Sequence, residues 1–408
     1  MGKTNKTKVI NNIKIILFFM YLLIFYMFGA DVEKVKYSEV LLLLFIGLEF
    51  LDVVRNKKIR YCIPIISVFI FAFYCFLSSF WAINSEIAID RAKTLFVLSV
   101  FLLVTYNSFS NIENGEDKLL KIIMYAGTIF SIYVIMYYGI GEYMTKLMNG
   151  DRIGTEINNV NTIGLQTSIS TIIAIFYGLY DNKKSYLLLS LIPLIVSLGT
   201  GSRKVIVLIV FGIILLFVLN REEKINLIKF TKKIIAFAII IALFLFVIRL
   251  PMFSTIYERM EMTINGLMGK GEFDHSTELR ETYIKAGMNQ FFKTPFLGVG
   301  IANSSYITMQ AVGISTYLHN NYIELLATTG ITGFCLYYSV YLYIIINCIK
   351  MLKTKNKFIN VVLVIFLTNM ILEYGMVSYY SKSTYIYILL GLITVQKERK
   401  GNIDEKDN

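Results

Sequence analysis

The feature that most constrains this chain is a series of apolar blocks, most of them roughly 18–23 residues long, with short charged segments between them. A helix of that length crosses the hydrocarbon core of a bilayer, which is ~30 Å thick. Charged residues make up 17% of the 408 residues, whereas a soluble protein has about a quarter. The pattern therefore predicts an all-α, polytopic membrane protein.

The blocks predict about twelve transmembrane helices, at residues 13–30, 37–54, 61–81, 92–109, 119–140, 160–179, 186–199, 204–220, 233–250, 331–349, 358–376 and 383–395. The first block is expected to be a retained helix, since no small-residue cleavage site ends it. We expect three regions: transmembrane helices 1–9 in residues 1–250, one large extracytoplasmic loop with a half-helix in 251–330, and helices 10–12 with a cytoplasmic tail in 331–408.

Lys and Arg gather in alternate connecting segments, among them 55–60, 220–232 and 350–357, and near both termini. Cytoplasmic loops are enriched in these residues, so the pattern predicts a multi-pass protein of the cell membrane with both termini in the cytoplasm. Segments 141–159 and 251–318 then lie on the extracytoplasmic side. Neither segment is rich in Pro or Ser, and we expect both to be ordered.

The net charge of +12 does not indicate nucleic-acid binding, because most of the Lys and Arg lie in short loops between apolar blocks. Only two His are present, His275 and His319, so we do not expect a multi-His metal site. The Cys lack the spacing of a disulfide framework or a zinc site. We expect them to be small buried hydrophobic residues: Cys62, Cys75, Cys335 and Cys348.

Two stretches of the large outer segment carry candidate catalytic residues. The first is a helix that starts near Ser276, carries Arg280 and stops before Pro295, because the residue before Pro avoids helical geometry. The second is a half-helix at residues 319–329, with His319 in its first turn and Gly330 at its end. An imidazole at this position is suited to accept a proton.

Two more arginines lie at the predicted outer face. Arg203 opens the eighth span, two residues after Gly201, and Arg152 precedes Gly154 near the start of the sixth span. Positive charge on this side opposes the usual trend and indicates an anionic ligand, such as a lipid diphosphate. Each residue also has a simpler interpretation, because an Arg near a span end commonly snorkels to lipid phosphate and a His commonly caps a helix.

Other polar residues give weaker evidence of a functional site. His275 belongs to no motif, and we expect it to be structural or exposed. Glu373, near the outer end of its span, could orient a nearby cation. Glu49, Asp52 and Arg55 are expected to form a local charge set near the inner interface.

Several motifs together resemble the O-antigen ligase and O-antigen polymerase superfamily. The most specific is His319-Asn320-x-Tyr322-Ile323-x-Leu325-Leu326, followed by Gly330 and Gly333. The others are Arg280-x-x-Tyr283, Pro295-Phe296-Leu297-Gly298-x-Gly300, Gly201-Ser202-Arg203, and Arg152-x-Gly154 with Asn159-x-Asn161 and Gly164. Many members of the superfamily have Trp where Tyr283 stands.

The resemblance implies a metal-independent glycosyltransferase whose donor is a glycan on undecaprenyl diphosphate. Residue by residue, His319 and Arg280 match the family's catalytic His and loop Arg. Arg203 matches an Arg that faces the same cavity and would bind the diphosphate, and Arg152 matches this role less closely. Arginines can stabilise the charge that develops on the leaving diphosphate, and His319 can accept the proton of the acceptor hydroxyl.

The function expected first is polymerisation of lipid-linked oligosaccharide repeat units into a capsule or O-antigen-like polysaccharide at the extracytoplasmic face. One alternative is a ligase that transfers the glycan to a lipid core, a protein or a wall polymer. Another class is a transporter of polysaccharide or small solutes, which internal repeats would favour. The expected partners are the lipid-linked oligosaccharide, an acceptor glycan, membrane lipid, and chain-length regulator and flippase proteins; no nucleic acid is expected.

Overall fold

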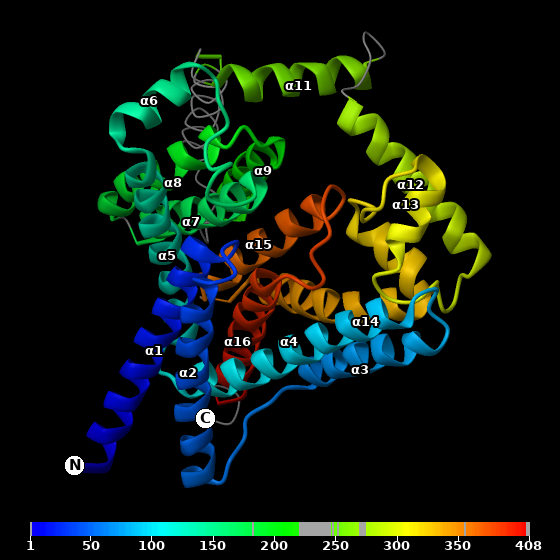
Figure 1. Ribbon diagram of the computed structural model, residues 1–408. Helices are drawn as coiled ribbons and strands as arrows, with labels where there is room; N and C mark the ends of the chain where they lie inside the picture. Colours follow the sequence, from blue (N-terminus) through cyan, green and yellow to red (C-terminus); the bar gives the residue numbers. More distant parts are fainter. Residues whose placement is uncertain are drawn as a thin grey trace. The chain divides into compact units, whose positions relative to one another are not determined.

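All regular structure in the described part of the chain is helical, as the sequence predicts (Figure 1). The computed structural model describes residues 2–181, 183–219, 246, 249–250, 253–268, 275–354 and 356–404. Five of the described helices are long and apolar enough to cross a membrane, and two more are apolar but shorter. The number of twelve crossings stays a prediction, and most of the ninth expected span, 233–250, lies outside the described residues.

The chain divides into two compact units. The first unit comprises Met1–Lys58 and Asn114–Gly271, and the second comprises Ile59–Glu113 and Glu272–Asn408. The first contains α1 (Gly2–Phe28), α2 (Val35–Asn56), α5 (Gly115–Tyr138), α6 (Ile140–Met148), α7 (Val160–Tyr180), α8 (Lys184–Gly199), α9 (Arg203–Leu219) and α11 (Ser254–Leu267). The second contains α3 (Ile63–Leu77), η1 (Ser78–Phe80), α4 (Ser85–Asn111), α12 (His275–Lys293), α13 (Ser304–Val312), α14 (Asn321–Lys350), α15 (Phe358–Leu372) and α16 (Lys382–Asp404).

In the first unit, α7 packs against α5, α8 and α9, while α1 packs against α2 and α5. A buried ion pair lies between α1 and α2, where the ammonium of Lys14 contacts Glu49 at 2.7 Å and also contacts Asp52. Removal of one partner from a buried pair leaves an uncompensated charge, so these residues stabilise the contact between the two helices. Of the local charge set expected from Glu49, Asp52 and Arg55, the two carboxylates therefore pair with Lys14, whereas Arg55 is exposed.

In the second unit, α3 packs between α4 and α14, and α16 contacts α4, α14 and α15 (Figure 1). The polar helix α12 packs on α13 and α14. It does so through the buried Tyr283 and Gly287, which face Leu318, the residue before His319. The packing of α12 therefore fixes the chain immediately before the predicted catalytic His.

Asparagine side chains begin several of these helices. The Asn84 side chain accepts from the N–H of Ile87 at 3.1 Å, and that of Asn159 accepts from the N–H of Asn161 at 2.9 Å. The first amide groups of a helix have no partner within the helix, so a side-chain acceptor at this point stabilises its start. These caps fix the first residues of α4 and α7.

The two segments that the charge pattern assigns to the outer face are ordered where the structure describes them, as predicted. Residues 141–159 include most of α6, and residues 251–318 include α11, α12 and α13. Helix α12 ends at Lys293, before Pro295, as its sequence predicts. His275 is exposed at the first residue of α12.

The expectation that all four Cys are buried was wrong for one of them. Cys62, Cys75 and Cys348 are buried, but Cys335 is exposed. It lies on α14, where an exposed apolar thiol suits a lipid environment.

Candidate functional site

The first site feature is the short turn between α8 and α9. Gly201 has a φ of 62°, in the left-handed region that favours glycine. The N–H of Ile153 donates to the carbonyl oxygen of Gly199 at 2.9 Å, and the Nε–H of Arg152 donates to that of Thr200, also at 2.9 Å. The segment that carries Arg152 is therefore bound to the backbone of this turn.

Two further arginines border the same turn. The Nη1 of Arg203 donates to the hydroxyl of Thr263 in α11 at 2.7 Å. The Nη1 of Arg259, also in α11, contacts the carbonyl oxygen of Gly201 at 3.4 Å. We refer to Arg152, Arg203 and Arg259 as the guanidinium cluster.

The guanidinium cluster produces a positive potential in this part of the first unit. Burial and the positive fields of Arg259 and Arg203 lower the pKa of the Arg152 guanidinium. An Arg nevertheless keeps its proton, so three positive groups lie near one turn and an anion bound among them would be stabilised. Planar guanidinium groups bind phosphate oxygens through paired hydrogen bonds, which makes the cluster suited to a diphosphate.

Sequence reasoning missed Arg259. It follows Glu258 within a segment of mixed charge, and nothing in the spacing of α11 indicates that its side chain reaches Gly201. Only the packing of α11 against α9 brings the two together.

The second site feature is His319, whose predicted position in the first turn of a helix was wrong. Helix α14 begins at Asn321, and the preceding Asn320 is its cap, with its side chain accepting from the N–H of Ile323 at 3.1 Å. His319 therefore precedes the cap and has a φ of 56°. A left-handed conformation is uncommon for a residue with a side chain, and such conformations concentrate at functional sites.

Two aromatic rings hold the imidazole of His319. The ring of Tyr317 lies 4.0 Å from it, between centroids, and the ring of Tyr283 is nearly parallel to it at 5.9 Å. Burial raises the pKa of the Tyr317 phenol, and Arg280 is near enough to lower it in part. We refer to Arg280, Tyr283, Tyr317 and His319 as the imidazole cluster.

A buried carboxylate holds the backbone next to His319. Glu324 is 2% exposed and accepts the hydroxyl of Ser304 at 2.6 Å and the N–H of Leu318 at 2.9 Å. Each carboxylate oxygen has a partner, as a buried carboxylate requires. Glu324 therefore connects α13, α14 and the residue that precedes the imidazole.

A second buried carboxylate connects the start of α14 with the segment after α15. Glu373 accepts the hydroxyls of Tyr338 at 2.7 Å, Tyr341 at 3.0 Å and Ser378 at 2.5 Å. Its carbonyl oxygen accepts the N–H of Asn321 at 2.8 Å. Among the described residues, the hydrogen-bond donors to the carboxylate of Glu373 are hydroxyl groups of a buried network, and none is a cation of the kind that it could have oriented.

The glycines of the motifs permit a close backbone crossing. Helix α14 is broken at Gly330, with a φ of 65°, where the half-helix was predicted to end. The loop before Val299 runs alongside this break: the N–H of Ile331 donates to the carbonyl of Pro295 at 2.8 Å, and the N–H of Val299 donates to that of Ala327 at 3.1 Å. A Cβ at Gly298 would overlap the backbone of Thr328.

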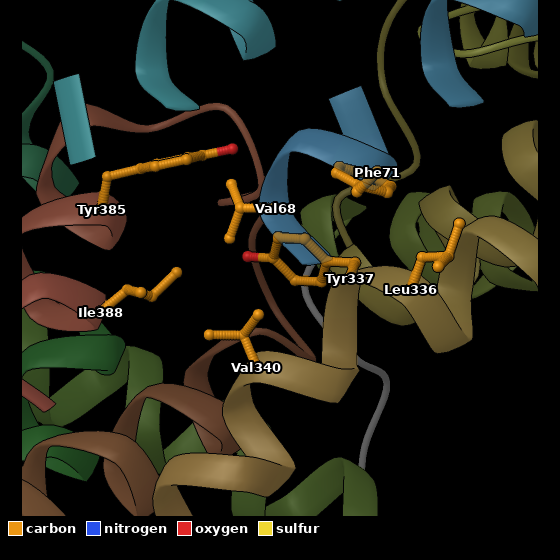
Figure 2. A pocket seen from close by; sticks show the side chains of 7 residues that line it. All are labelled: Val68, Phe71, Leu336, Tyr337, Val340, Tyr385 and Ile388. Carbon is orange, nitrogen blue, oxygen red and sulfur yellow. The ribbon is translucent and has the colours of Figure 1, made fainter. Parts of the chain in front are cut away.

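An apolar pocket lies elsewhere in the second unit, between α3, α14 and α16 (Figure 2). Seven residues line it: Val68, Phe71, Leu336, Tyr337, Val340, Tyr385 and Ile388. None of the predicted site residues is among them, and its apolar lining gives no means of binding a diphosphate.

The structure places the four predicted site residues as two pairs. Arg152 and Arg203 belong to the guanidinium cluster of the first unit, and Arg280 and His319 belong to the imidazole cluster of the second. That all four line one pocket stays a prediction.

The long apolar helices, together with the cationic clusters, define the class: an all-helical membrane protein. Residues 188–338 match the sequence model of a family described as O-antigen ligase. The match supports the O-antigen ligase and polymerase superfamily and confirms the resemblance stated from the motifs. Members of this family are glycosyltransferase-like enzymes. No curated protein matches the chain.

The matched segment covers a little over a third of the chain, from within α8 to the second half of α14. It contains Arg203, Arg259, Arg280 and His319, whereas Arg152 lies before it. Both clusters therefore have members inside the matched segment.

Proposed function

We propose that the protein polymerises oligosaccharide repeat units, linked to undecaprenyl diphosphate, into a capsule or O-antigen-like polysaccharide at the extracytoplasmic face of the cell membrane. The observation that carries the proposal is the guanidinium cluster, in which Arg152, Arg203 and Arg259 surround one turn and the fields of Arg259 and Arg203, after burial, lower the pKa of Arg152. A diphosphate on a lipid carrier is an anion that a membrane protein meets at this depth.

The reaction is a single displacement at the anomeric carbon of the donor. The acceptor hydroxyl oxygen forms a bond to that carbon, the bond from the carbon to the diphosphate oxygen breaks, and undecaprenyl diphosphate leaves. His319 accepts the proton of the acceptor hydroxyl. Arginines stabilise the negative charge on the leaving diphosphate, so no metal ion and no cofactor are needed. Attack from the face opposite the leaving group inverts the anomeric configuration.

Contacts in the second unit support the assignment of its site to one side of the membrane. The indole N–H of Trp81 donates to the carbonyl of Leu297 at 3.2 Å, and the N–H of Asn84 donates to the side chain of Asn303 at 2.7 Å. The N–H of Ser378 donates to the side chain of Asn321 at 2.9 Å. Segments that the predicted topology places on one face thus pair with one another, which supports the predicted alternation of the loops between the two faces.

The test compares the two His of the chain in cells from which the chromosomal copy has been deleted. Replacement of His319 with Ala should abolish the polysaccharide while the protein remains in the membrane, because the hydroxyl proton then has no acceptor. Replacement of the exposed His275 with Ala is the matched control and should restore full yield. Normal glycan length and yield with the His319→Ala variant would refute the proposed base.

A ligase is the second candidate, and the description of the matching family favours it. The two activities share the donor and differ in the acceptor. Loss of a polymerase leaves single repeat units on the final acceptor, whereas loss of a ligase leaves long chains on the lipid carrier. Electrophoresis of both glycan pools from the deletion strain separates them. A transporter would instead move glycan across the membrane without forming a new covalent bond.

The proposed partners follow from this reaction. They are the lipid-linked donor, an acceptor glycan, the surrounding lipid, a flippase that delivers repeat units and a regulator of chain length. Co-purification with the protein, before and after removal of lipid-linked glycan, tests the last two.

A further inference from the structure

Arg91 lies in the second turn of α4, in the second unit, and its side chain is held by an aromatic ring. The guanidinium carbon lies 3.7 Å from the centroid of the Tyr380 ring, a close cation–π contact. Tyr380 belongs to the segment between α15 and α16. The Tyr380 ring covers one flat face of the guanidinium, so the N–H groups along the guanidinium edge do not point at the ring.

One of these edge groups has no acceptor. The Nε atom of Arg91 is buried and, among the residues that the structure describes, has no hydrogen-bond partner. A buried donor without an acceptor is costly, and such groups in native proteins commonly mark the place of a ligand, an ion or water. The position therefore calls for an oxygen that the described part of the chain does not supply.

The buried Glu324 is not that acceptor. Its field reaches Tyr380, as does that of Arg91. Its two carboxylate oxygens, however, accept from Ser304 and Leu318, and the described residues show no hydrogen bond between it and Arg91.

Arg91 is a neighbour of the imidazole cluster. After burial, which is the larger cause, the field of Tyr380 raises the pKa of Tyr317, so the two phenols lie within electrostatic range of each other. Tyr317 in turn contacts the ring of His319 at 4.0 Å. Arg91 contacts Tyr380, Tyr380 acts electrostatically on Tyr317, and Tyr317 contacts the ring of the proposed base; Arg280 also acts on Tyr317.

We propose that Arg91, held against the ring of Tyr380, binds the lipid-linked substrate beside His319, with its Nε–H donating to a phosphate oxygen. The inference rests on the proposed function and adds a binding residue that none of the sequence motifs contains. A phosphate is the matching ligand because the flat edge of a guanidinium presents parallel N–H groups to two of its oxygens.

The test measures binding of undecaprenyl diphosphate, without any sugar, to the purified full-length protein in detergent. Replacement of Arg91 with Met should weaken binding by about tenfold or more, since a charged hydrogen bond is lost. Replacement with Lys should weaken it by less, because Lys keeps the charge but lacks the Nε–H. Lys93 lies on the same helix, is exposed and pairs with Asp90 at 3.1 Å. Lys93→Met is therefore the matched control and should bind as the wild type does.

Wild-type affinity in both Arg91 variants would overturn the proposal. If Arg91→Met does not fold, the test uses the folded Arg91→Lys variant alone. Unchanged affinity of that variant for undecaprenyl diphosphate would also overturn the proposal. If Arg91 instead holds a bilayer headgroup, Arg91→Met would lose co-purifying phosphatidylglycerol and keep its affinity for undecaprenyl diphosphate. That result would also overturn the proposal.

Failure of the proposed function gives a different pattern. His319→Ala would then still form polysaccharide, whereas Arg91→Met would still lose affinity for undecaprenyl diphosphate. The binding measurement and the product measurement therefore separate the two claims.

Discussion

The ring of Tyr317 lies 4.0 Å from the ring of His319, between centroids, with the planes inclined by 39°. His319 precedes the cap of α14 and has a left-handed backbone, so the helix itself does not orient its side chain. The orientation of the imidazole depends instead on the rings that contact it, Tyr317 and Tyr283.

We therefore expect replacement of Tyr317 with Leu to lower product formation by about tenfold or more, because a misdirected base loses much of its contribution. Replacement with Phe keeps the ring and should restore most of the activity. The yield and length of the polysaccharide, at equal amounts of protein in the membrane, give the measurement. The control is Tyr37→Leu, since Tyr37 is 65% exposed on α2. Equal losses with Leu and Phe would assign the effect to the hydroxyl instead.

The guanidinium cluster predicts a shared effect on diphosphate binding. Replacement of Arg152, Arg203 or Arg259 with Met should each weaken the binding of undecaprenyl diphosphate by about tenfold, the size of one lost charged hydrogen bond. Lys should restore part of the affinity, since it keeps the charge without the paired geometry. Arg55, which is exposed on α2, provides the control variant Arg55→Met. If the Met variant of one of these arginines binds undecaprenyl diphosphate as tightly as the control does, that arginine does not contribute to diphosphate binding.

Chelation of divalent cations should leave the reaction unchanged. If guanidinium groups stabilise the leaving diphosphate, membranes treated with EDTA should convert lipid-linked repeat units at the untreated rate. Product formation is followed with and without added Mg²⁺ or Mn²⁺. Complete loss with EDTA, restored by one of these ions, would show that a metal carries the charge instead.

The crossing of the 295–299 loop over the break in α14 predicts a strict requirement for glycine. Replacement of Gly298 with Ala introduces a Cβ that overlaps the backbone of Thr328, at a φ of 66°. We expect a loss of about 1–3 kcal/mol of stability, measured as a lower temperature of thermal unfolding in detergent. Gly47→Ala is the control, because nothing lies within 4 Å of its added Cβ. Equal unfolding temperatures for the two variants would contradict the expectation.

The hydrogen bonds that Glu373 accepts predict a loss of stability when an amide replaces its carboxylate. In Glu373→Gln, an amide N–H₂ replaces one of the oxygens that accept from Tyr338, Tyr341 and Ser378. At least one buried hydroxyl then loses its acceptor, which costs about 1–3 kcal/mol. The unfolding temperature should fall, while Glu142→Gln, at an exposed position on α6, should leave it unchanged. A Glu373→Gln variant as stable as the wild type would show that the network accepts an amide.

The sequence alone determined much of the helical structure, because helix formation in an apolar block is a local matter. In a bilayer every backbone N–H and C=O must be satisfied within the segment, so a block of sufficient length becomes a helix whatever it packs against. Local sequence signals also correctly predicted that α12 ends before Pro295 and that α9 begins at Arg203. The motifs around His319 also sufficed to indicate the family.

The tertiary structure alone decided what surrounds each site residue. Arg259 and Arg91 reach their neighbours only through helix packing and ring contacts, which no spacing along the chain encodes. His319 lies outside the helix because Asn320 is the cap residue, and its short side chain accepts the N–H of Ile323. Contacts between residues far apart in sequence depend on how whole helices pack, so a local sequence pattern does not predict them.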